Sequence, residues 1–364
     1  MPNTHKQDSQ EVVKTVQVQS HGKVILAGEN FVAFGGTAIV CGIDLYSRCI
    51  ATQWNESFCR IQIGFEVYEF DKESCLQAYL VALTFCKKRD FQTLAGLNAQ
   101  RTVFWVRSIL GQLLVEGIHF PNFCACIQLG APLGSGLGGS ATITSLLVRT
   151  AARLAERRIP GDQLYRLCAS GDMIAHGGGT GTDSAGIVFA GFLAWNRCIG
   201  LRRLKVPMPI QFILCDSRQT KSSSTSLERL RVLQAQKTSK FDDIMRQLRG
   251  ISREVEQALK AGPDLSWLGS LMVQNQELLR LTGVSTPEID EIVRVSLEAG
   301  ALGAKVTGGG CGGFVLILAL PECLEQVVTA LHAVQKSAFC VKTKDASPVT
   351  TLDYERRRDS QLNL

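Results

Sequence analysis

The residues most suited to chemistry form a glycine-rich loop in front of a serine. Four glycines fall within six residues, and Ser140 follows them: Gly134, Gly136, Gly138 and Gly139. Glycine tolerates positive φ and lets a ligand approach the backbone amides without a Cβ in the way. A strongly helical segment begins near Ser140, and the first N–H groups of a helix have no partner inside it. The loop therefore predicts an anion site, and phosphate is the usual ligand of such a site.

The loop pattern alone does not decide what is bound. Gly134, Gly136 and Gly139 satisfy G-x-G-x-x-G, which also occurs in unrelated loops. A dinucleotide site would need a second strand that ends in an acidic residue, and no such strand is evident after the helix. No lysine follows the glycines, as the nucleotide-binding P-loop would require. Phosphate binding is favoured, and an ordinary glycine-rich turn is the alternative.

Two charged residues could act on a ligand bound there. Lys23 begins a short apolar run that ends in Gly28-Glu29-Asn30, and Asp183 lies in a second glycine-rich segment, residues 176–186. A carboxylate at the tip of such a turn can come close to a bound ligand and act as a general base. The alternative for Asp183 is a turn aspartate bonded to nearby backbone amides. A third glycine cluster spans residues 305–313.

The hydrophobic periodicity predicts the elements that would position these residues. We expect strands at 23–30, 37–45, within 47–68, and at 123–129, 186–195, 208–215, 314–320 and 339–342. We expect helices at 74–88, 102–117, 140–155, 162–174, between 226 and 262, and at 265–281, 287–299 and 321–335. The pattern is weak at 90–99, and residues before about 20 lack periodicity, so this N-terminal stretch is expected to be disordered or tag-like.

Length and composition exclude several classes of protein. A chain of 364 residues with 45% hydrophobic residues predicts a globular protein of two domains or of one elaborated domain. A net charge of +6 spread over this length is too diffuse for nucleic-acid binding. No apolar run is long enough to span a membrane, and the polar N-terminus is no secretory signal. The thirteen cysteines lack zinc-ligand spacing, which predicts reduced thiols.

Taken together, the ordered glycine motifs resemble those of the GHMP kinase superfamily, and within it the mevalonate kinase branch. The three family motifs resemble residues 23–35, 132–141 and 305–313, and residues 275–279 and 283–287 resemble that branch. The resemblance implies an α+β fold of two domains, an N-terminal one like ribosomal protein S5 domain 2 and a ferredoxin-like C-terminal one. On this basis residues 1–20 precede the N-terminal domain at 21–204, and a tail at 351–364 follows the C-terminal domain at 205–350.

The resemblance also implies a reaction, the ATP- and Mg²⁺-dependent phosphorylation of the primary alcohol of mevalonate. The residues that would hold the ATP phosphates are Pro132, Gly134, Ser135, Gly136, Leu137, Gly138, Gly139 and Ser140. Ser140 and Asp172 would bind Mg²⁺, and because Asp172 stands where the family commonly has the longer glutamate, its coordination can run through a water. The alternative for Asp172 is a solvated acid at a helix end. Asp183 would orient or deprotonate the alcohol, and Lys23 would pair with it. The expected substrate contacts are Lys23, Asn30, Asp183, Thr220 and Gly309.

Two departures from the family pattern bear on the acceptor. Asn30 stands where the first motif usually has histidine, and Gly179-Thr180-Gly181 replaces a Pro-Ser-Gly segment. Asn30 could still donate a hydrogen bond to a substrate carboxylate. Another GHMP kinase, acting on phosphomevalonate, homoserine or a sugar, and a non-catalytic metabolite sensor are the alternatives. The last three residues lack the peroxisomal Ser-Lys-Leu address, so a cytoplasmic location is expected, with an organelle and a homodimer left open.

Overall fold

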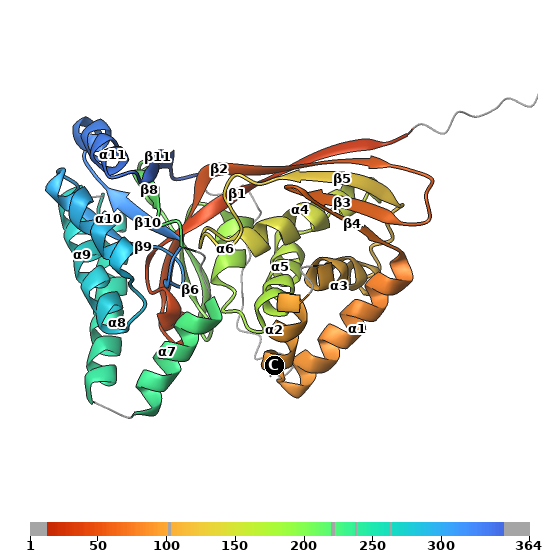
Figure 1. Ribbon diagram of the computed structural model, residues 1–364, viewed down its shortest axis with the longest axis horizontal. Coiled ribbons are helices and arrows are strands. Elements are labelled where there is room, and N and C mark those ends of the chain that lie inside the picture. Colours follow the sequence, from red (N-terminus) through yellow and green to blue (C-terminus); the bar gives the residue numbers. More distant parts are fainter. Residues whose placement is uncertain (1–12, 101–102, 220–222, 237–238, 263, 346–364) are drawn as a thin grey trace, which may run out of the picture.

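Two β-sheets organise the molecule. A computed structural model of the chain describes residues 13–100, 103–219, 223–236, 239–262 and 264–345. A seven-stranded sheet is built from the first part of the chain, and a four-stranded sheet from the second (Figure 1). Helices cover both sheets, so the architecture is mixed α+β with two domains, as predicted.

The longest strands of the molecule are β1 (Thr15–Ala27) and β2 (Ala38–Gln53), which pair antiparallel. Between them lie the turn at Gly28 and a short 3₁₀ helix, η1 (Asn30–Phe34). Gly28 has φ of +83°, and a Cβ there would lie 2.2 Å from the carbonyl oxygen of Thr37, so only glycine fits. The prediction that residues 15–20 are disordered is wrong, because Val18 is buried and alternates with polar neighbours, as in a half-buried strand.

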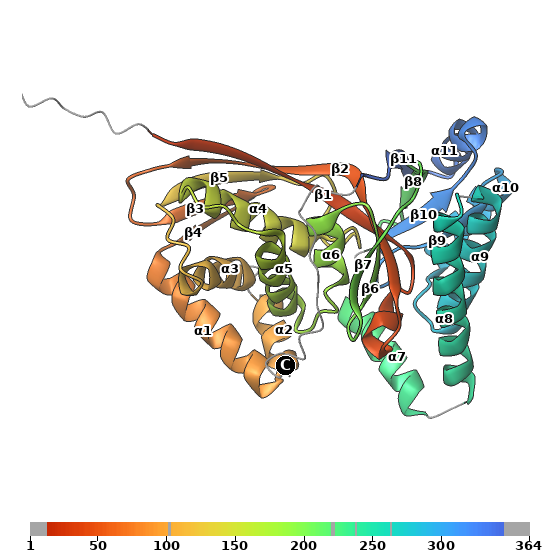
Figure 2. The same ribbon diagram turned by 180° about the vertical axis from the view of Figure 1, so that it is seen from behind.

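The remaining strands of the large sheet are β3 (Cys59–Ile63), β4 (Glu66–Phe70), β5 (Phe123–Gln128), β6 (Phe192–Asn196) and β7 (Gly200–Leu204), in the order β4-β3-β5-β2-β6-β7. Helices α1 (Lys72–Lys88), α2 (Phe91–Gln100), α3 (Val103–Val115), α4 (Gly139–Leu154) and α5 (Gly161–His176) gather beneath it (Figures 1 and 2). Helix α2 and strand β7 were not predicted. Both are short and carry little periodic apolar pattern.

The second sheet and its helices come from the rest of the chain. They are β8 (Gln211–Asp216), α7 (Ser223–Ala235), α8 (Ser239–Lys260), α9 (Leu265–Leu281), α10 (Pro287–Glu298), β9 (Gly303–Val306), β10 (Phe314–Leu318), η2 (Pro321–Cys323), α11 (Leu324–Ala333) and β11 (Ser337–Lys342). Their strand order is β11-β8-β10-β9, all antiparallel, so the first strand lies between the fourth and the third. That order is the ferredoxin-like arrangement that was expected.

The first part of the strand predicted at 186–195 is helical, and the correction matters for the site. Residues 182–189 form helix α6 (Thr182–Phe189), and strand β6 begins only at Phe192, not at residue 186. A short apolar run that is buried on all sides does not distinguish helix from strand by its periodicity. The structure therefore places Asp183 in the first turn of a buried helix rather than at the tip of a turn.

The two domains share part of their hydrophobic core. Leu26 and Ile39 from the large sheet pack in one cluster with Leu214 and Leu316 from the small sheet and with Met272 of α9. A shared core fixes the domains relative to each other, and with them the groups at their boundary. All thirteen cysteines are unpaired, as predicted. Among the described helices, none combines the length and apolar character needed to cross a bilayer.

Buried His21 predicts a pH dependence of stability. Burial lowers the pKa of His21 from 6.5 to about 4, and the nearby Lys344 and Arg149 lower it further, against a hydrogen bond to the carbonyl of Gly22. The unfolded chain takes up a proton below about pH 6.5 and the folded chain does not, so the free energy of unfolding falls as the pH drops from 6.5 towards 4. We expect a loss of about 2 kcal/mol between pH 7.5 and pH 5.

Urea unfolding at these two pH values measures this loss. The His21→Gln variant removes the titrating group, so its free energy of unfolding should change less between pH 7.5 and pH 5 than that of the unchanged protein. Equal changes in both proteins would show that His21 does not cause the dependence.

Candidate active site

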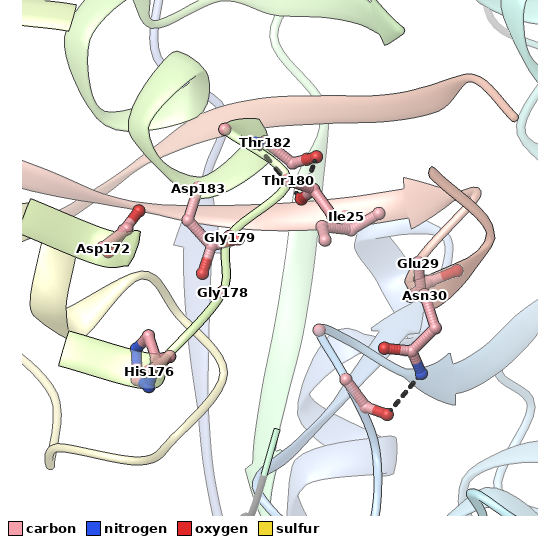
Figure 3. Close-up of a pocket in the computed structure, with 13 residues that line it drawn as sticks. Ile25, Glu29, Asn30, Asp172, His176, Gly178, Gly179, Thr180, Thr182 and Asp183 are labelled. Carbon is pink, nitrogen blue, oxygen red and sulfur yellow. Dashed lines mark hydrogen bonds between the residues drawn. The ribbon is translucent and has the colours of Figure 1, made fainter. Parts of the chain in front are cut away.

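A cavity lies between the segment around Gly179, the turn after β1 and the third glycine cluster. Its lining residues are Ile25, Glu29, Asn30, Asp172, His176, Gly178, Gly179, Thr180, Gly181, Thr182, Asp183, Gly308 and Gly309 (Figure 3). The structure thus gathers Asn30, Asp172, Asp183 and Gly309, which the sequence analysis assigned to metal or substrate. Two predicted substrate contacts remain: Lys23 is not among the lining residues but bonds to one of them, and Thr220 lies outside the described residues.

Lys23 and Asp183 form an ion pair at the edge of this cavity. Lys23 Nζ lies 2.6 Å from Asp183 Oδ1, and the lysine side chain is fully buried while the aspartate is 34% exposed. Nζ also donates to the carbonyl oxygen of Gly136 at 3.0 Å, so one ammonium connects the glycine loop to the carboxylate. A Cβ on Gly186 of α6 would lie 2.9 Å from Lys23 Cβ, so a glycine at this position lets the helix approach the strand. The carboxylate is therefore held beside a buried positive charge and faces a ligand space.

The glycine loop leads into a helix start without a side-chain cap, while its Ser135 and Leu137 amides are bonded within the loop, to Pro132 O at 3.3 Å and to Ser135 Oγ at 3.4 Å. Gly134, Gly136 and Gly138 have φ of 76°, 85° and 85°. Helix α4 begins at Gly139, and its N-cap, Gly138, offers no side chain to the first amides of the helix. Uncapped amides at a helix start form an anion site.

The third glycine cluster packs against this loop. Phe314 donates its backbone N–H to the carbonyl of Ser135 at 3.2 Å. A Cβ on Gly313 would lie 2.6 Å from the same oxygen. Leu137 accepts the backbone N–H of Lys23 at 3.1 Å, so the loop is fastened to β1 as well. Pro132 and Gly134 are exposed, whereas Ser135 and Leu137 are buried beneath the loop.

Asp172 is buried next to the start of α4. Its Oδ1 accepts from Ser140 Oγ at 2.6 Å and its Oδ2 from Ser184 Oγ at 2.7 Å. Burial raises the pKa of Asp172, and the charge of Asp183 raises it further, while His176 and the two hydroxyl donors oppose this. The alternative of a solvated helix-end acid is therefore wrong for Asp172.

The side-chain oxygen atoms of Ser140 and Asp172 suit a hard cation. The described residues contain no group of three or more His, Cys, Asp or Glu side chains arranged to hold a metal ion. Mg²⁺ is commonly held by one or two carboxylates together with waters and substrate phosphates. Ser140 at the start of α4 and Asp172 of α5, which lie beside the glycine loop, fit that kind of site.

Two polar groups around the cavity, His176 and Glu29, were not predicted from the sequence. His176 lies in the last turn of α5 with Nε2 3.0 Å from Ser140 Oγ. Its spacing of four from Asp172 places both on one helix face, a signal the sequence did contain. Glu29 forms a fully buried ion pair with Lys305, and Asn275 donates to the other oxygen of Glu29 at 3.3 Å. Nothing in the sequence pairs Glu29 with a lysine so distant along the chain.

Comparison with known proteins agrees with this geometry. The family model described as "GHMP kinases N terminal domain" matches residues 106–191, and "GHMP kinases C terminal" matches residues 255–336. The first match contains the glycine loop and Asp183, and the second contains the third glycine cluster. The chain belongs to the GHMP kinase superfamily.

Curated relatives and solved structures narrow the resemblance within this superfamily. Mevalonate kinase from Thermococcus sibiricus is 26% identical over 321 residues, covering 87% of this chain and 92% of the relative. The Schizosaccharomyces pombe enzyme is 26% identical over 347 residues, covering 86% and 85%. The Methanococcus jannaschii mevalonate kinase structure has a TM-score of 0.77 at 21% identity, covering 91% of this chain and 99% of its own. The chain thus resembles mevalonate kinases over nearly their full length.

Proposed function

We propose that this GHMP protein is a mevalonate kinase, which transfers the terminal phosphoryl group of ATP to the primary alcohol of mevalonate. The observation that carries the proposal is the Lys23–Asp183 ion pair of 2.6 Å, which links the glycine loop to the cavity. Sequence relatives named mevalonate kinase support the choice of acceptor. A related solved structure, that of the L. major enzyme, contains R-mevalonate; it is 23% identical with a TM-score of 0.72 and covers 92% of this chain.

The chain's part in nucleotide binding follows from the loop. The backbone from Gly134 to Ser140 places its amides along the triphosphate, and the start of α4 stabilises negative charge. Ser140 Oγ and the Asp172 carboxylate would hold Mg²⁺, which neutralises phosphate charge when bound. His176 positions the Ser140 hydroxyl from the other side.

The chemistry at the alcohol follows from the ion pair. Phosphoryl transfer needs an aligned hydroxyl and stabilised charge more than covalent help. Asp183 Oδ accepts the hydroxyl hydrogen and orients the oxygen towards the phosphate. Lys23, which is buried and already bonded to Gly136 O at 3.0 Å, stabilises negative charge that develops on the attacking oxygen. The lysine is preorganised because its side chain is fully buried, so no water has to leave it during the reaction.

Removing the Ser140 hydroxyl should change how the enzyme uses metal. In Ser140→Ala, Asp172 Oδ1 loses its donor at 2.6 Å, and the metal loses one oxygen. We expect the Mg²⁺ concentration for half-maximal turnover to rise by about tenfold, in line with the loss of one weak ligand. Steady-state assays over a Mg²⁺ series measure this, with the exposed Ser270→Ala as the matched control. An unchanged Mg²⁺ dependence would remove Ser140 from the proposed metal site.

A panel of small alcohols tests the acceptor. ADP release is measured with ATP and, in turn, mevalonate, phosphomevalonate, homoserine and galactose. We expect mevalonate to give the highest kcat/KM. A higher value for one of the others would assign the chain to a different GHMP activity, and ATP binding without turnover of any alcohol would indicate a metabolite sensor.

A further inference from the structure

Asn30 occupies a fixed position at the boundary of the two domains. It is the first residue of η1 and follows Glu29, whose carboxylate pairs with Lys305 and accepts a hydrogen bond from Asn275. Its Nδ2 donates to the carbonyl oxygen of Gly309, in the other domain, at 2.6 Å. The backbone on one side and this bond on the other leave the side chain little freedom.

The bond to Gly309 sets which way the amide faces. A carbonyl oxygen only accepts, so the nitrogen of Asn30 must be the atom next to it, since the flipped amide would oppose two acceptors. Figure 3 shows the result, with the amide nitrogen on the dashed bond and the amide oxygen turned towards the segment of Gly178 and Gly179. Within the described residues Oδ1 has no hydrogen-bond donor, so the cavity meets an acceptor at this point.

The charges around the cavity also favour a hydrogen-bond donor, rather than a carboxylate, next to Asn30. Among its described lining residues none is a lysine or an arginine, whereas Glu29, Asp172 and Asp183 are carboxylates. Lys23, just behind the wall, is already committed to Asp183 and Gly136. A substrate carboxylate placed at Asn30 would meet an acceptor oxygen and no cation among the described lining residues, whereas a hydroxyl there would donate a hydrogen bond.

We propose that Asn30 is a specificity residue whose amide oxygen accepts a hydrogen bond from a second hydroxyl of the acceptor substrate. The inference rests on the proposed function, in which that group is the tertiary hydroxyl of mevalonate. The expectation from sequence that Asn30 donates to the carboxylate is thereby replaced. A site that hydrogen-bonds a substrate hydroxyl discriminates strongly against the analogue without it, because the buried acceptor is then left unpaired.

A double-mutant cycle between residue and substrate tests this. The kcat/KM is measured for the unchanged enzyme and for Asn30→Ala with three acceptors. These are mevalonate, the analogue in which hydrogen replaces the tertiary hydroxyl, and mevalonamide, in which a neutral amide replaces the carboxylate. We expect the deoxy analogue to be about 10- to 100-fold poorer for the unchanged enzyme but less than about threefold poorer for Asn30→Ala. The penalty for mevalonamide should be the same in both enzymes.

The results of the cycle distinguish a hydroxyl partner of Asn30 from a carboxylate partner. A deoxy penalty that Asn30→Ala leaves unchanged, or a mevalonamide penalty that shrinks instead, overturns the proposal. Asn122→Ala, which removes a similar bond to the backbone of Glu56 outside the cavity, is the matched control. If Asn30→Ala does not fold, Asn30→His replaces it in the same cycle. A deoxy analogue that the unchanged enzyme uses as well as mevalonate would by itself contradict the proposal. If the panel selects another diol, only the mevalonate assignment fails, and the cycle is run on that diol and its deoxy analogue.

Discussion

The Asp183→Asn variant should turn over mevalonate at least about 100-fold more slowly than the unchanged enzyme, while binding ATP with the same affinity. The amide keeps the size of the carboxylate and can still accept a hydrogen bond from Lys23, which lies 2.6 Å away. It cannot accept the proton of the alcohol, and it no longer balances the buried ammonium. Because Asp183 does not belong to the glycine loop, nucleotide binding should survive.

Initial rates at saturating substrates and a fluorescent-nucleotide titration measure the two quantities separately. Asp243→Asn is the matched control, since Asp243 is 53% exposed and pairs with Arg246 on the surface of α8. Turnover in Asp183→Asn within a few-fold of the control would contradict the role of Asp183. Loss of ATP binding together with turnover would show that the variant is damaged more widely than the assignment allows.

The Lys305→Met variant should lose about 3–5 kcal/mol of stability, the typical cost of leaving a buried charge without its partner. The side chains of Lys305 and Glu29 are 0% and 1% exposed. Burial lowers the pKa of Lys305, and the charge of Glu29 opposes that shift, which shows how far each charge depends on the other. Lys305 also donates to the carbonyl of Val306 at 2.7 Å, so its loss leaves a backbone acceptor unpaired as well.

The double variant Glu29→Gln with Lys305→Met distinguishes lost charge balance from lost packing. Replacing both charges removes the unpaired carboxylate, so urea unfolding should show at least half of the lost stability recovered. Arg294→Met, which breaks the exposed pair between Arg294 and Glu298, is the control and should cost less than about 1 kcal/mol. A Lys305→Met effect no larger than that of the control would mean that the buried pair does not hold the domain boundary together.

The general architecture could be predicted because its signals are local. Each glycine cluster marks a place where backbone must adopt positive φ, as at Gly136 and Gly138, with φ of 85° at both. The apolar stripe after Ser140 predicts α4 with the correct start, and the ferredoxin-like order of the small sheet agrees with the family resemblance. Motifs of this kind fix positions along the chain independently of distant contacts.

What could not be predicted depends on contacts between distant segments. Asp183 was expected in a turn, but α6 forms because its residues are buried against β1, β2 and α4, where tertiary packing overrides the local pattern. The partner of Glu29 lies 276 residues away, and that of Asn30 lies 279 away. The direction in which the Asn30 amide faces follows from the second of these contacts, so the residue type alone could not indicate it.

A crystal structure of the protein with a non-hydrolysable ATP analogue and mevalonate would show whether the glycine loop and the Lys23–Asp183 pair act as proposed. We expect the triphosphate along residues 134–140, and the primary hydroxyl oxygen within about 3.2 Å of a carboxylate oxygen of Asp183. The tertiary hydroxyl should point to Asn30. A triphosphate bound away from the glycine loop, or an alcohol with no primary hydroxyl near Asp183 and Lys23, would contradict it.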